Sequence, residues 1–160
     1  MRKPVSEHRL LTFYALRITS RSIPFSIPHP LPTLARVTSP LALLLYERLL
    51  PGSALGNKLR DQGYRIQHLT DAASLVATAE QEKPLVVFVD LELKHSDTFA
   101  AIKSLKATAG TAHLPILAFS SPRHEKLQVD ALTAGATLIA SDEAILAQLP
   151  AMLDQAMAVE

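Results

Sequence analysis

The chain has 160 residues, of which 48% are hydrophobic and 19% charged, a composition typical of a globular protein rather than a disordered one. It contains no cysteine, which excludes disulfides, thiol nucleophiles and thiolate metal sites and fits a reducing compartment. No apolar run approaches the roughly 18 residues that a membrane-spanning helix needs. We therefore expect a cytoplasmic protein that does not enter a membrane.

The net charge of +1 hides two different parts of the chain. Residues 1–36 carry six Lys or Arg against one acid, whereas residues 37–160 carry ten Lys or Arg against fourteen acids. A nucleic-acid partner is not expected, because the longer part is acidic and only 5% of the residues are aromatic.

Residues 1–38 form a basic, proline-rich extension in front of a regular domain over residues 39–160. Proline removes a backbone donor and restricts its neighbour, so residues 23–32 are excluded from a regular helix or a central strand. Three interpretations stay open: a disordered extension, a targeting segment that is removed, or an arm or over-long start. A targeting segment would place the mature protein in an organelle instead. The prolines are Pro4, Pro24, Pro28, Pro30 and Pro32.

From residue 39 onwards, short apolar segments alternate with amphipathic ones. The predicted strands are 41–45, 64–69, 84–90, 115–120 and 137–140. The predicted helices are 53–63, one that begins behind Thr70, 97–107, 124–134, and a terminal helix interrupted at Pro150. This alternation predicts an α/β fold: a flavodoxin-like, doubly wound, five-stranded parallel sheet of order 2-1-3-4-5 with helices on both faces.

Polar side chains stand where the predicted strands end, the edge at which such sheets carry their functional groups. Glu47 follows the first strand, Asp90 ends the third, Ser120 ends the fourth, and Asp142 follows the fifth. Asp90 lies 43 residues after Glu47, Ser120 lies 30 after Asp90, and Asp142 lies 22 after Ser120.

Three segments resemble the receiver domains of two-component response regulators. Residues 86–99 are similar to that family's third strand, phospho-accepting aspartate and following loop, whose second aspartate would be Asp97. Residues 115–121 resemble the fourth strand with its terminal hydroxyl, and residues 134–136 the Gly-Ala before the fifth strand. The resemblance covers about 120 residues and implies Asp90 at the phosphoacceptor position, Ser120 at the switch hydroxyl and Asp142 at the lysine position.

The chain departs from that family at three positions. Tyr46 replaces the first acid of the acidic pair, Asp142 (Ser141 if the register slips by one) replaces the lysine, and Ile139 replaces the switch aromatic. The family uses Mg²⁺, for which Glu47 and Asp90 are the remaining ligands. An anion in place of a cation would repel a phosphoryl group, so we expect a crevice short of positive charge.

These departures predict a non-enzymatic, stand-alone pseudo-receiver that works by protein–protein contact. The partner would be a histidine kinase, another signalling protein or a second copy. The resemblance places the contact face at Leu127, Val129, Leu132, Ile139, Ile145 and Leu146. One alternative is a working phosphorelay at Asp90. Another is a small α/β enzyme, for which Ser120, His95 and Asp90 could be written as a hydrolytic set, although no Gly-x-Ser-x-Gly motif supports it.

Overall fold

The computed structural model of this chain describes residues 38–159. The expectations for the basic extension therefore fall almost entirely outside the described residues. Within residues 38–159, no helix has the length and apolar character required to cross a membrane.

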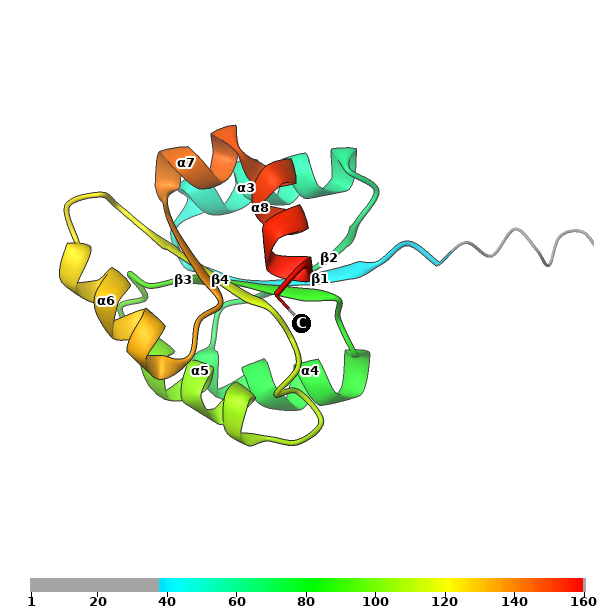
Figure 1. Ribbon diagram of the computed structural model, residues 1–160, viewed down its shortest axis with the longest axis horizontal. Helices are drawn as coiled ribbons and strands as arrows, with labels where there is room; N and C mark the ends of the chain where they lie inside the picture. Colours follow the sequence, from blue (N-terminus) through cyan, green and yellow to red (C-terminus); the bar gives the residue numbers. More distant parts are fainter. Residues whose placement is uncertain (1–37, 160) are drawn as a thin grey trace, which may run out of the picture. The chain divides into compact units, whose positions relative to one another are not determined.

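The strands form a single parallel sheet in the order β2-β1-β3-β4-β5, which confirms the predicted topology (Figure 1). Their register brings the strand ends level, so that Asp90 lies beside Phe119 and Ser120 lies beside Ser141. The five strands are β1 (Leu41–Leu45), β2 (Arg65–Leu69), β3 (Val86–Asp90), β4 (Ile116–Ser120) and β5 (Leu138–Ser141).

Helices cover both faces of this sheet (Figure 1). Those on one face are α3 (Leu49–Asp61), α7 (Asp142–Ala147) and α8 (Leu149–Met157). Those on the other face are α4 (Leu75–Glu82), which follows the 3₁₀ turn η1 (Ala72–Ser74), α5 (Thr98–Ala107) and α6 (Glu125–Ala134). The two faces have separate apolar cores, with Phe88 and Phe119 on the α3 side and Ile102 and Leu105 on the α5 side.

The burial of the strands explains why their sequences differ. β1, β3 and β4 are buried at every residue, because helices cover both of their faces, and their sequences are accordingly apolar almost throughout. β2 is an edge strand with partly exposed, mostly polar residues. The third strand therefore delivers a fully buried carboxylate, Asp90, at its last position.

Two helix starts differ from the expected ones. The first helix begins at Leu49 rather than residue 53, and the segment behind Thr70 begins as a 3₁₀ turn capped by Asp71. The terminal helix is interrupted as predicted, because Pro150 lies in the first turn of α8, where its missing N–H costs no helical hydrogen bond.

Candidate functional site

The C-terminal ends of β1, β3 and β5 meet around the carboxylate of Asp90. Asp90 is the last residue of β3 and its side chain is fully buried, whereas Asp142 is the first residue of α7 and is mostly covered. Arg48, in the loop after β1, extends its side chain between these two acids. The site is therefore assembled from three segments that are distant in the sequence.

Arg48 binds both oxygens of Asp90. Its Nε donates to Asp90 Oδ2 at 2.8 Å and its Nη2 donates to Oδ1 at 2.8 Å, a bidentate arrangement that suits the planar guanidinium. The other edge of the same guanidinium donates to Asp142, with Nη1 at 2.9 Å from Oδ2 and Nη2 at 3.1 Å from Oδ1. Arg48 thus links the two acids that were expected, by resemblance, at the phosphoacceptor and lysine positions.

A third carboxylate completes this group, which we call the Arg48 cluster: Arg48, Asp90, Glu92 and Asp142. Glu92 Oε1 lies 3.4 Å from Arg48 Nη1, and the backbone N–H of Glu92 donates to Asp90 Oδ1 at 2.9 Å. Every guanidinium nitrogen therefore faces a carboxylate oxygen. With the carboxylates ionised, one positive charge stands against three negative ones, which leaves the cluster with a net charge of −2.

The expectation of a crevice short of positive charge is corrected in one respect: Arg48 reaches into it, although three carboxylates outnumber this cation. The resemblance implies a cation only at the lysine position, where the chain has Asp142. The structure supplies a cation from the opposite side, because the long, flexible side chain of Arg48 spans the crevice. Arg48 could have been found from the sequence as the residue directly after Glu47, at a strand end that otherwise carries acids.

Burial and pairing act in opposite directions on the two central groups. Burial raises the pKa of the Asp90 carboxyl above its usual value, and the hydrogen bonds from Arg48 and from the Glu92 backbone offset only part of this. Burial also opposes the charge on Arg48, but the hydrogen bonds to Asp90 and Asp142 outweigh it and raise the pKa of the guanidinium. Arg48 therefore stays charged at any pH at which the protein is folded.

The two predicted magnesium ligands, Glu47 and Asp90, bind different parts of the chain. The Glu47 carboxylate accepts from the backbone N–H groups of Lys94 at 3.1 Å and His95 at 3.4 Å, so it holds the loop after β3. Both oxygens of Asp90 are bound by Arg48. No group of three or more His, Asp or Glu side chains within the described residues is placed to hold a metal ion. This arrangement of residues does not fit Mg²⁺.

Tyr46 stands directly after β1, at the position where the resemblance implies the first acid. Its ring stacks on His68 with centroids 4.0 Å apart, and His68 Nε2 lies 3.0 Å from the Tyr46 carbonyl oxygen. The ring also lies against Gly52, where any Cβ would collide with it. The position is therefore built for an aromatic side chain rather than for a carboxylate.

Ser120 is buried at the end of β4, and its hydroxyl is used locally. Its Oγ accepts from Gln128 Nε2 at 3.2 Å and donates to the Ser121 carbonyl at 3.3 Å. Ser120 thus bonds to α6 and to its own loop, while Asp90 bonds to Arg48. The structure places the two residues at neighbouring strand ends without linking their side chains.

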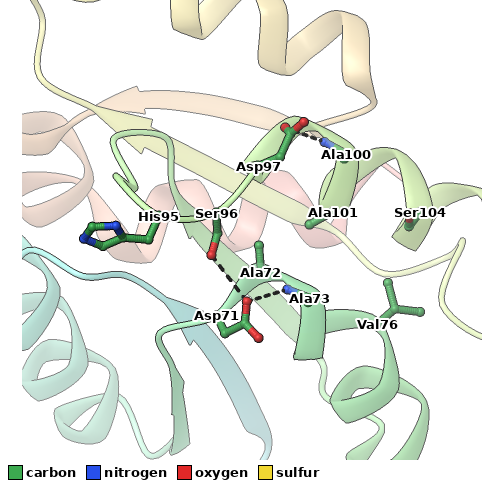
Figure 2. Close-up of a pocket in the computed structure, with 10 residues that line it drawn as sticks. All are labelled: Asp71, Ala72, Ala73, Val76, His95, Ser96, Asp97, Ala100, Ala101 and Ser104. Carbon is green, nitrogen blue, oxygen red and sulfur yellow. Dashed lines mark hydrogen bonds between the residues drawn. The ribbon is translucent and has the colours of Figure 1, made fainter.

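A shallow groove of about 380 Å³ lies on the other side of the strand ends, between η1 and α5 (Figure 2). Asp97 accepts from Ala100 N at 3.1 Å, and so caps α5. Asp71 accepts from Ala73 N at 3.0 Å and from the hydroxyl of Ser96 at 3.3 Å (Figure 2). These acids are helix and turn caps, as the general preference for acids at helix starts would suggest for Asp97.

The hydrolytic set is not assembled. His95 is exposed and lines the groove beside Asp71 (Figure 2), whereas Ser120 bonds to Gln128 and Asp90 to Arg48. Ser120 and Asp90 are thus oriented by different neighbours, and neither bonds to His95. The arrangement offers no base for the serine hydroxyl, which corrects that version of the enzyme alternative.

The expected contact face is only partly available. Ile145 is fully buried in the core, so it is removed from the face, because a side chain inside the core cannot touch a partner. Leu127 and Ile139 pack partly against the α5-side core and Leu146 partly against the α3-side core. The exposed apolar side chains of the region are Val129 at 60% and Leu132 at 53%, both on α6.

Comparisons with known proteins agree with this architecture. The family model of the response regulator receiver domain matches residues 52–153, a range that includes Asp90, Ser120 and Asp142 and begins just after Arg48. No curated protein matches the chain in sequence.

Among solved structures, the receiver domain of NtrX from Brucella abortus superposes with a TM-score of 0.67 at 21% identity, over 74% of this chain and 99% of that one. The receiver domain of the sensor histidine kinase PA1611 from Pseudomonas aeruginosa, solved with a magnesium ion coordinated in its active-site cleft, gives 0.68 at 21% identity, over 75% and 98%. The response regulator domain of CheB from Thermotoga maritima gives a TM-score of 0.64 at 19% identity, over 76% of this chain and 98% of that one.

Proposed function

Since the chain belongs to the response regulator receiver domain family, we propose that it is a signalling module that has lost phosphorylation at Asp90. Receiver domains belong to two-component signal transduction, where they contact histidine kinases and other signalling proteins. In this proposal the module still acts by protein–protein contact, but phosphorylation of Asp90 no longer controls that contact.

The observation that carries the proposal is the bidentate bond from Arg48 to both oxygens of Asp90. A carboxylate that accepts a phosphoryl group must present a free oxygen lone pair in line with the leaving group. Here both oxygens of the fully buried Asp90 carboxylate accept hydrogen bonds from Arg48 N–H groups. Attack would require Arg48 to leave and expose an unpaired charge in the crevice, which is energetically costly.

Charge opposes the same reaction. Phosphoryl transfer needs positive charge around the transferring group, which metal ions and basic side chains usually supply. Arg48 is the only basic group of its cluster, and its donors are already shared among three carboxylates. Asp142 adds negative charge where the family has a lysine. A dianionic phosphate would therefore be repelled rather than held.

The proposed partner is a protein, namely a histidine kinase or another signalling protein, in the cytoplasm. The exposed apolar residues that support this are Val129 and Leu132 on α6. Leu127, Ile139 and Leu146 of the expected face are half-buried, and Leu146 packs against the core on the other side of the sheet. A second copy of the chain could use the same face, and the molar mass measured in solution decides between the two arrangements.

The test is incubation of the full chain with acetyl phosphate and Mg²⁺, followed by intact mass measurement. We expect no gain of a phosphoryl group, because Arg48 occupies the acceptor and no acidic group among residues 38–159 is placed to hold a metal ion beside it. Asp90→Asn is the matched control, since it keeps the size of the side chain and removes the nucleophile. A mass gain in the natural protein that disappears in Asp90→Asn would overturn the proposal in favour of a working phosphorelay.

A further inference from the structure

Helix α6 is attached to the sheet by unusually small side chains. Its fully covered residues are Ala131 and Ala134, with Leu127 only partly buried. The neighbouring helix α5 buries Ile102 and Leu105 completely. Because the gain from burial grows with the apolar area removed from water, packing anchors α6 less firmly than α5. The position of α6 therefore depends more on what holds its ends.

The N-terminal end of α6 is organised by Ser121 and His124. The Ser121 carbonyl accepts from His124 N at 3.0 Å, and the His124 carbonyl accepts from Leu127 N at 3.0 Å. Gln128, one turn into the helix, reaches back to Ser120 Oγ. The loop and the first turn of the helix thus form one hydrogen-bonded unit, which moves together if it moves at all.

Glu92 ties this unit to the Arg48 cluster. Its Oε1 accepts from the backbone N–H of Ser121 and lies 3.4 Å from Arg48 Nη1. Its Oε2 lies 3.9 Å from Nε2 of His124. One carboxylate, about 20% exposed, therefore touches the loop after β1, the loop after β4 and the residue that precedes α6.

We propose that Glu92 couples the Arg48 cluster to α6 and holds the face formed by Val129 and Leu132 in one position without any modification of Asp90. The Arg48 cluster thus holds the N-terminal end of α6 at all times, and the domain keeps one position of this helix. The inference rests on the proposed function in one respect, that this face of α6 is the one a partner contacts.

The test is amide hydrogen exchange of the full chain, read residue by residue by NMR. Replacing Glu92 by alanine removes the acceptor of the Ser121 N–H. We expect exchange at Ser121 and along residues 127–134 to rise at least about fivefold, while the amides of α5 keep their natural rates. Arg48→Met also lowers the stability of the whole domain, so it should raise exchange in α6 by a larger factor than in α5, because it removes the other end of the tether.

Glu82→Ala is the matched control, since Glu82 is an exposed glutamate on α4, far from α6 in the chain. It should leave both helices unchanged. If Glu92→Ala does not fold, Glu92→Gln keeps an oxygen acceptor and removes the charge, so a smaller rise confined to α6 is expected.

Two results would overturn the inference. Faster exchange at Ser121 with unchanged α6 amides would mean that the hydrogen bond is merely local. Equal acceleration in α5 and α6 would mean a general loss of stability. Both outcomes are independent of the phosphorylation assay. A phosphoryl group on Asp90 of the natural protein would refute the proposed function whatever the amide exchange rates are.

Discussion

The two sides of the strand-end edge use acidic side chains in different ways. Beside α4 and α5, the carboxylates of Asp71 and Asp97 accept backbone N–H groups two and three residues further along the chain. Beside β5 and α7, Asp90 and Asp142 instead share Arg48, at separations of 42 and 94 residues. One side consists of local caps, and the other is a long-range ion cluster in a covered crevice.

This difference shows which acids act independently and which depend on a shared partner. A local cap acts independently of its neighbours and stabilises one helix end. The members of the Arg48 cluster depend on each other, because removing one leaves a covered charge without its partner. Substitutions in the Arg48 cluster should therefore have large effects on the free energy of unfolding that depend on one another. Substitutions of Asp71 or Asp97 should have small effects that add independently.

The largest effect is expected from Arg48→Met. Methionine keeps much of the apolar stem of the side chain and removes the charge, so Asp90 is left buried and ionised without a cation. We expect the free energy of unfolding to fall by about 3 kcal/mol, the low end for a buried pair that loses one partner, because Arg48 is partly exposed. Urea unfolding followed by circular dichroism measures it.

Two further variants isolate the cause of that loss. Arg60→Met, on the exposed side of α3, should change the free energy of unfolding by less than about 0.5 kcal/mol. Adding Asp90→Asn to Arg48→Met should recover part of the loss, because it removes the unpaired charge. The interdependence of the cluster is refuted if the double variant is less stable than Arg48→Met alone.

A smaller effect is expected from Asp97→Ala on the other side. Asp97 accepts from Ala100 N and caps α5, so its loss should lower the free energy of unfolding by about 1 kcal/mol. The loss should be additive with that of Arg48→Met, since the two residues share no partner. Asp97→Asn, which retains a capping oxygen, should lose less; a loss as large as that of alanine would show that capping is not its role.

The smallest effect concerns pH and the raised pKa of Asp90. A folded-state pKa above the unfolded value of about 3.9 means that the folded protein binds this proton more tightly. The contribution of Asp90 to stability is then full below the unfolded pKa and declines as pH rises through the folded pKa. As pH rises from the unfolded-state pKa of Asp90 through its folded-state pKa, the natural protein should therefore lose stability relative to Asp90→Asn.

Parallel urea titrations of both proteins at several pH values measure this difference. A difference that instead grows with pH would mean that the attraction of Arg48 outweighs burial and that the pKa of Asp90 is lowered.

Much of the fold was predictable because its signals are local. The four apolar segments and the alternating segment 64–69 became the five strands, and Gly135, with a φ of 119°, ends α6 where expected. The functional edge followed from the same pattern, since Asp90, Ser120 and Asp142 all stand at or just past predicted strand ends. Ile145, one residue of the expected contact face, is buried instead, because a short amphipathic segment does not show which of its apolar residues face the core.

What the sequence by itself determined is the parallel sheet and the place of the acids along its edge, because strand periodicity and turn residues act over a few neighbours. Only the tertiary structure decided which charges meet. Glu47 and Arg48 are adjacent in the chain, yet one turns to the loop after β3 and the other to Asp90 and Asp142. Long side chains reach partners that depend on the packing of every strand and helix between them, and no local pattern encodes that choice.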